Sequence, residues 1–219
     1  MDNSKEIINK TIVFVKDTLS CAEGGHDWFH VERVYKNALL IAENETVDIF
    51  VVSLAALLHD IADSKFHEGD ETVGPRIAQE FLVKLNVNSE VIEHIINIIK
   101  HISFKNSLAK KSNFTSKEFD VVQDADRLDA IGAIGIARCF NYGGFKNRPL
   151  YNPDVKPNLQ MSKTEYKNSS APTINHFYEK LLLLKDKMNT ITGKHLALER
   201  HAFMEEYLNQ FFNEWEGKR

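Results

Sequence analysis

The feature that most constrains this chain is an apolar run, Ile49–Leu58, that ends in the pair His59-Asp60. A run with almost no polar side chain predicts a helix that is buried on all sides. An imidazole and a carboxylate at its end are costly to bury unless each is paired, hydrogen-bonded or metal-bound. The run is too short to span a bilayer, which takes about 20 apolar residues. The sequence therefore predicts a central buried helix that ends in a polar site.

Apolar residues recur at helical spacing along most of the chain, and no run alternates with period two for long enough to propose a sheet. Asp27 is expected to cap the second helix, and Thr115 with Glu118 to form a capping box at the start of the sixth. We therefore expect an all-α fold, with one domain over residues 1–219 arranged as a bundle around the buried helix. The helices are expected over residues 5–19, 28–43, 48–60, 72–85, 89–102, 115–140, 174–188 and 196–215.

The helical pattern stops between Asn141 and Pro172, where four of the five prolines fall. An irregular segment of about thirty residues in a compact domain is usually functional or disordered. Two interpretations stay open. One is a polar surface connection, and the other is a lid over a site, in which a nucleotide would be contacted by Lys146, Arg148, Tyr151, Tyr166 and Lys167.

Histidine and aspartate recur in one order on the predicted helices: His30, the pair His59-Asp60, and the aspartates of Gln123-Asp-Ala-Asp-Arg-Leu-Asp129. This order resembles the HD-domain phosphohydrolases. The resemblance implies a divalent metal ion held by His30, His59, Asp60 and Asp126. Further segments are similar to small stand-alone bacterial HD hydrolases, a subgroup like the nucleoside triphosphate pyrophosphohydrolases. They are Leu57–Phe66, Gly69–Glu71, Tyr142–Gly144, Ile174–Leu181 and Phe203–Leu208, so the resemblance covers nearly the whole chain.

Two imidazoles with two carboxylates suit a borderline divalent ion, with Mn favoured, Co, Ni, Fe and Zn suitable, and Mg acceptable. Four protein ligands on an octahedral ion leave two positions for water and a phosphate oxygen, which is a catalytic arrangement. Asp129 shares a helix face with Asp126, being three residues away. It is expected to orient a ligand from outside the metal shell, and it is the reserve ligand.

Residues around the expected ligands suggest further roles. Asp63 lies one helical turn after His59, and in related HD enzymes an acidic residue there orients the attacking water or takes its proton. The alternative is an ordinary helix-end aspartate. Lys65 and Arg127 are candidates for phosphate contact, although Arg127 would also suit a structural ion pair. His101 belongs to a stretch shared with the subgroup and is a candidate substrate neighbour.

His176 and Lys180 lie one helical turn apart on the side of their predicted helix away from its apolar stripe, Ile174 to Met188. They match the subgroup. Substrate contact and helix packing both stay open for this pair.

Composition limits the partners. A net charge of −4 argues against a protein that coats nucleic acid or an anionic membrane. The two cysteines, Cys21 and Cys139, have no zinc or redox spacing and fit a reducing cytoplasm. No secretion signal or membrane span is visible. The apolar stripe over residues 196–215 is either internal core or a dimer face, so both a monomer and a homodimer are compatible with it.

The expected reaction is hydrolysis of a nucleotide. No Walker-type glycine loop is present. The residues after His59-Asp60 are Ile-Ala-Asp-Ser, unlike those of guanosine tetraphosphate hydrolases, and the Gly-Tyr-Pro motif of cyclic-di-GMP phosphodiesterases is missing. The resemblance implies cleavage between the α and β phosphates of a (deoxy)nucleoside triphosphate. The alternatives are a 5′-nucleotidase acting on monophosphates and a nucleotide sensor without turnover.

Overall fold

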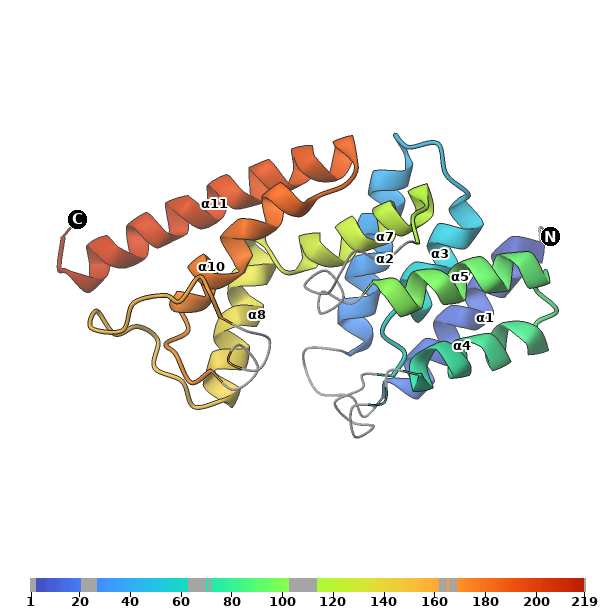
Figure 1. Cartoon of the computed structure of the whole chain (residues 1–219), viewed down its shortest axis with the longest axis horizontal. Coiled ribbons are helices and arrows are strands. Elements are labelled where there is room, and N and C mark those ends of the chain that lie inside the picture. The colour runs from blue at the N-terminus through green and yellow to red at the C-terminus, as the bar shows by residue number, and fades with distance from the viewer. Residues whose placement is uncertain are drawn as a thin grey trace. The chain divides into compact units, whose positions relative to one another are not determined.

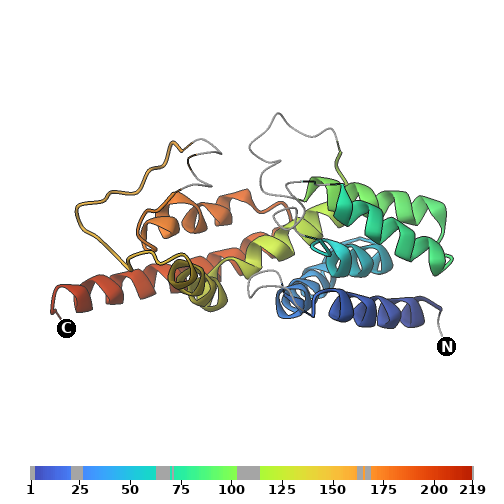
Figure 2. The ribbon, with the colours of Figure 1, turned by 90° about the horizontal axis from the view of Figure 1, so that it is seen from below.

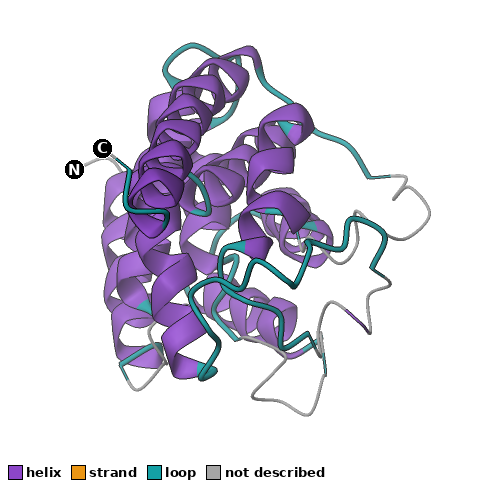
Figure 3. Ribbon diagram, turned by 90° about the vertical axis from the view of Figure 1, so that its left-hand side faces the viewer, coloured by secondary structure: helices purple, strands orange, loops and turns teal. Residues whose placement is uncertain are grey.

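The computed structural model describes residues 3–20, 27–62, 70, 72–102, 114–161, 165 and 169–218. Within these ranges every regular element is a helix and none is a strand, as the purple ribbons of Figure 3 show. The all-α fold predicted from the sequence is therefore confirmed. The chain divides into two compact units, residues 1–125 and 126–219, which are described in turn. No helix in the described part of the chain is long and apolar enough to cross a membrane.

The N-terminal unit is arranged around α3 (Ile49–Leu58), which packs against α1, α2 and α5. In Figure 2, α3 lies between α1 on one side and the α4–α5 pair on the other. Figure 1 labels the elements of this unit, which are α1 (Asn3–Thr18), α2 (Trp28–Ala42), α4 (Val73–Lys84), α5 (Ser89–His101) and the first part of α7 (Lys117–Asp129).

The central position of α3 follows from its sequence. Every residue from Val51 to Leu58 is buried, so the helix has no solvent face after its first two residues. The Asp48 carboxylate caps its start by accepting the N–H groups of Phe50, at 2.8 Å, and Val51, at 3.3 Å. The helix ends at Leu58, two residues before the predicted end. His59 and Asp60 thus follow the buried helix rather than complete it.

The predicted helix over residues 115–140 is wrong in two respects. It begins with Ser116, whose hydroxyl accepts the N–H of Phe119 at 3.0 Å, so there is no Thr115 capping box. It is also interrupted: α7 ends at Asp129, and α8 (Gly132–Phe145) starts with Gly132 at a φ of +73°. A residue in this left-handed conformation cannot continue an α-helix, and glycine adopts it without steric cost.

The C-terminal unit contains α8, α10 (Asn175–Glu179), the 3₁₀ helix η2 (Leu181–Lys187) and α11 (Ile191–Trp215). The long helix α11 packs against α8 and η2. The single helix predicted over residues 174–188 is wrong, because the backbone leaves the helical region at Lys180, with φ −145° and ψ −57°. The apolar side chains Ile174, Phe177, Leu181 and Leu184 are nevertheless all buried, as their spacing predicts.

Candidate metal centre

His30 lies in the first turn of α2, where the start of the helix is held in place. The Asp27 carboxylate accepts the backbone N–H of His30 at 2.9 Å, so the predicted cap is confirmed. Only 3% of His30 is exposed, and Val31 and Val34 beside it are fully buried. The inward face of α2 therefore places an imidazole ring inside the N-terminal unit, where it needs a polar or metal partner.

His59 follows the last residue of α3 and is oriented by the helix it leaves. Its Nδ1 lies 2.8 Å from the carbonyl oxygen of Ala56. A carbonyl oxygen can only accept, so Nδ1 carries a proton and donates it. In the neutral ring, Nε2 then has the lone pair that a metal ion needs. A backbone carbonyl on the far ring nitrogen is the usual way in which a metal-binding histidine is oriented.

His30, His59 and Asp60 converge at one place in the N-terminal unit. The two rings meet edge to face, with centroids 5.3 Å apart and an interplanar angle of 68°. Nε2 of His30 lies 3.9 Å from Oδ2 of Asp60. One donor atom from each of the three side chains lies within 4.8 Å of the other two. Across the described ranges, no other group of three or more His, Cys, Asp or Glu residues comes together in this way.

The geometry and the donor atoms fit a divalent ion. Ligand atoms about 2.1 Å from an octahedral ion are roughly 3 to 4 Å apart. The three donors therefore need only a small inward movement to bind one ion. Two imidazoles and a carboxylate are ligands that transition metals of borderline softness share. The Asp60 side chain is only 18% exposed, so a cation beside it would offset the cost of its burial.

Asp126 is the first residue of the C-terminal unit, and its place as the fourth ligand stays a prediction. The helix that carries it is held by α2 as far as the preceding residue. The Asn37 side-chain amide donates a long hydrogen bond, 3.5 Å, to the carbonyl of Ala125. Asn37 lies two helical turns after His30 and so shares its face of α2.

Two predicted site residues near Asp126 have structural partners in the C-terminal unit. Asp129 is 1% exposed and forms an ion pair with the Arg138 guanidinium. The Arg127 guanidinium donates to the carbonyl of Lys187, and its role as a phosphate contact stays a prediction. The sequence reasoning did not identify Arg138 as a partner, because its nine-residue separation from Asp129 spans the break between α7 and α8.

His101, the last residue of α5, has local partners. Its Nδ1 is 2.7 Å from the carbonyl of Asn97, and its ring stacks on Phe114 with centroids 5.2 Å apart. These contacts hold the ring in one orientation, and a role in substrate binding stays a prediction. Asp63 and Lys65 lie outside the described residues, so the predicted general base and one predicted phosphate contact stay predictions as well.

The irregular segment over residues 141–172 carries Arg148, whose guanidinium lies over the ring of Tyr142 at 5.5 Å and donates to the carbonyl of Ser169. Tyr166 and Lys167 lie outside the described residues. His176 is largely removed from water, and this burial lowers its pKa to about 3, with smaller contributions from the charges of Lys180 and Arg148. The ring of His176 is therefore neutral at physiological pH.

Cys139, on α8, is half-buried. Its thiol lies 3.7 Å from the carbonyl of Thr173. Burial raises the pKa of Cys139 to about 12, and the charges of Arg148 and Lys180 offset only part of this rise. A thiol this far from ionisation is a poor nucleophile.

Comparison with known proteins gives one consistent result. The profile of the HD domain family matches residues 28–131. The YpgQ protein of Bacillus subtilis is 40% identical over 201 residues, which cover 90% of this chain and 88% of YpgQ. A crystal structure of an HD-superfamily hydrolase from Bacillus thuringiensis has a TM-score of 0.79 and 42% identity, covering 98% of this chain and 100% of that one.

YpgQ has also been solved in complex with ADP. Compared with this chain, that structure has a TM-score of 0.76 and a sequence identity of 36%. The match covers 97% of this chain and 96% of the YpgQ chain. The profile match begins at the start of α2 and contains His30, His59, Asp60 and Asp126.

Proposed function

Because the chain belongs to the HD-domain family and is a metal-dependent phosphohydrolase of that family, we propose that its substrates are nucleotides. The specific reaction that we propose is hydrolysis of a (deoxy)nucleoside triphosphate to a monophosphate and pyrophosphate. The observation that carries the proposal is the convergence of His30, His59 and Asp60 at the end of the buried helix. The complex of the relative YpgQ with ADP supports a nucleotide as the ligand.

We propose that Asp126 completes the ligand set. The family resemblance selects it among the aspartates of its segment. A bound divalent ion lowers the pKa of its water and polarises a phosphoryl oxygen. We favour Mn²⁺, since imidazole and carboxylate donors together suit it. Asp129 would lie outside the metal shell and would support the ligands by holding α7 in position.

The remaining predicted residues divide the work of hydrolysis. Asp63 is the proposed base that takes the proton of the attacking water. The water oxygen forms a bond to the α-phosphorus, the bond from that phosphorus to the bridging oxygen breaks, and pyrophosphate leaves. Lys65 and Arg127 are the proposed phosphate contacts, one as a point charge and one as a planar fork. His101 would lie beside the substrate.

Two alternatives use the same site differently. A 5′-nucleotidase would release orthophosphate from a monophosphate, and a nucleotide sensor would bind without turnover. The decisive experiment incubates the protein with deoxy- and ribonucleoside tri- and monophosphates, in separate reactions with Mn²⁺, Co²⁺, Ni²⁺ and Mg²⁺, and separates the products by chromatography. Pyrophosphate with monophosphate is the expected result. Orthophosphate with nucleoside would favour the nucleotidase, and binding without product would favour the sensor.

The Asp60→Ala variant is the control in this experiment. It should form no product with any metal, because it lacks a proposed ligand. Product formation at the wild-type rate by this variant would show that a contaminating hydrolase, or another site, carries the activity.

A further inference from the structure

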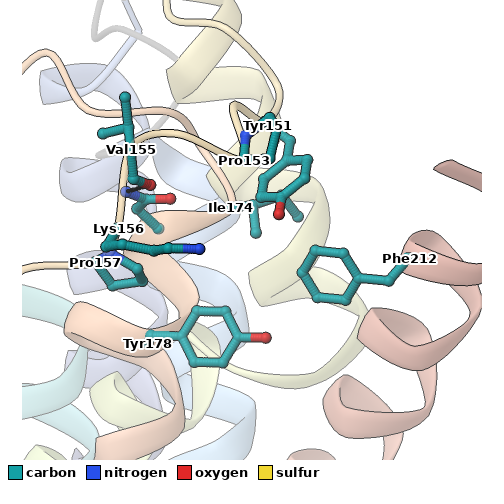
Figure 4. A pocket seen from close by; sticks show the side chains of 9 residues that line it. Tyr151, Pro153, Val155, Lys156, Pro157, Ile174, Tyr178 and Phe212 are labelled. Carbon is teal, nitrogen blue, oxygen red and sulfur yellow. Dashed lines mark hydrogen bonds between the residues drawn. The ribbon is translucent and has the colours of Figure 1, made fainter. Parts of the chain in front are cut away.

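The C-terminal unit contains a pocket of about 330 Å³ that no metal-site residue lines. Three aromatic side chains form its walls: Tyr151 after α8, Tyr178 on α10 and Phe212 on α11. Figure 4 shows the three rings around a common space, with Lys156 reaching toward it beside Pro157. The volume lies at the lower end of the range for small-molecule sites, about 300 to 1,000 Å³.

The walls of this aromatic pocket are held in place by contacts among the lining residues themselves and with Trp215. The Tyr151 ring meets Phe212 and Trp215 edge to face, with centroid distances of 5.2 and 5.1 Å. The Asn175 amide donates to the carbonyl of Val155 at 3.0 Å, which attaches the irregular segment to α10. A pocket whose walls are already ordered loses less entropy when a ligand binds.

The segment is attached to α10 a second time by the backbone N–H of Asn158, which donates to the Glu179 carboxylate at 3.0 Å. Part of the irregular segment, from Tyr151 to Pro157, therefore forms one wall of a pocket. Its two prolines at 153 and 157 restrict the backbone of that wall further.

The chemistry of the lining is aromatic and cationic. None of the lining residues is acidic, and Lys156 forms no ion pair within the described ranges. The segment around the pocket is basic, because residues 138–180 contain seven Lys or Arg residues but only three Asp or Glu residues. Burial and the neighbouring Tyr151 raise the pKa of Tyr178, whose hydroxyl therefore remains a hydrogen-bond donor.

We propose that this pocket binds a small planar aromatic molecule with one anionic group, of the nucleoside monophosphate class. Aromatic side chains stack on any nucleobase, since every base has a π-face. The ammonium group of Lys156 supplies the point charge for one phosphate. Because all the lining residues belong to the C-terminal unit, the proposal does not depend on the reaction at the metal centre.

The test uses the fluorescence of Trp215, which contacts the pocket wall through Tyr151. Trp28→Phe removes the second of the two tryptophans, and His59→Ala in the same full-length chain removes a proposed metal ligand. AMP, adenosine and inorganic phosphate are then titrated separately, with excitation at the red edge of the indole band. We expect saturable quenching by AMP, weaker binding of adenosine and no response to phosphate.

Two variants test the pocket, each checked for native helicity by circular dichroism. Lys156→Gln should raise the Kd for AMP about fivefold, the upper end for an exposed ion pair. Tyr178→Leu should raise it about tenfold through lost stacking. The matched control is Lys194→Gln, an exposed lysine at the start of α11 that does not line the pocket.

The proposal is overturned if AMP gives no saturable change, or if both pocket variants bind AMP as tightly as the control does. Equal responses to AMP and phosphate would overturn the aromatic part of the proposal. Equal affinities for AMP and adenosine would overturn the anionic part. Since the metal ligand is absent throughout, none of these outcomes depends on the hydrolase activity.

Discussion

The Nδ1 atom of His59 lies 2.8 Å from the carbonyl oxygen of Ala56, one turn back on α3. The last turn of the buried helix thus orients the ring that follows it. The free carbonyls at the end of a helix need donors, and His59 supplies one. Because this bond occupies Nδ1, Nε2 is the ring nitrogen left for a metal ion, and the end of α3 is also part of the candidate metal centre.

We expect His59→Ala and Asp60→Ala to abolish both metal content and turnover. Each variant removes one donor from a set of three whose atoms lie within 4.8 Å. Metal analysis of the purified proteins measures the first effect, and Mn²⁺ should raise the melting temperature of the wild type alone. His195→Ala, on the exposed face of α11, is the matched control. A near-stoichiometric ion in both ligand variants would refute the assignment.

Asp63→Asn is expected to keep the metal and lose turnover. The amide keeps the shape of the side chain but cannot accept a proton from water. General bases typically contribute about 10² to 10⁴ in rate, so kcat should fall by that order. Metal content and kcat are measured on the same preparation. Wild-type turnover would reduce Asp63 to a helix-end residue, whereas loss of the ion would make it a ligand and reopen the choice of Asp126.

Gly143→Ala is expected to destabilise the C-terminal unit, and Gly144→Ala is its matched control. A Cβ atom at position 143 would collide with the side chain of Thr173, which is 2% exposed and has no room to move. Overpacking of this kind costs about 1 to 3 kcal/mol. A Cβ at Gly144 meets nothing within 4 Å, so alanine there should be neutral or stabilise the helix by up to about 1 kcal/mol.

Urea unfolding of the two glycine variants and the wild type measures the difference. Equal midpoints for the two variants would show that α8 and Thr173 separate without cost. The expected result would explain why Gly143 stands at this place in the chain.

His176 should make the stability of the protein depend on pH. Its folded pKa of about 3 lies below the ordinary value of 6.5, so only the unfolded chain takes up this proton between those values. The contribution of His176 is complete above pH 6.5 and declines as the pH falls toward 3, by at most about 1.4 kcal/mol per pH unit.

The comparison is with His176→Gln, which cannot titrate. Unfolding free energies of both proteins are measured from pH 7.5 to 4.5, and the wild type should lose more stability on acidification than the variant does. Parallel curves would show that His176 is protonated equally in the folded and unfolded chains.

Local sequence determined much of this protein. The apolar run Ile49–Leu58 specified a helix that is buried on all sides from Val51 on, and Asp27 specified the start of α2 and hence the turn that carries His30. These features are readable because helical periodicity and capping involve residues at most four apart. The pair His59-Asp60 identified the chemistry, since neither group is buried without a partner.

Tertiary structure decided the features that local sequence patterns do not specify. The break between α7 and α8 is accompanied by the ion pair of Asp129 with Arg138 and by the bond of Arg200 to the carbonyl of Leu128 at 2.6 Å. The change from α10 to η2 left the burial of the apolar side chains intact, because a step of three residues, as from Leu181 to Leu184, stays on one face in both helix types. The aromatic pocket joins residues from three segments, of which Tyr151 and Phe212 are 61 positions apart. Contacts between residues this far apart in the sequence depend on how the helices pack against one another. Local periodicity does not predict them.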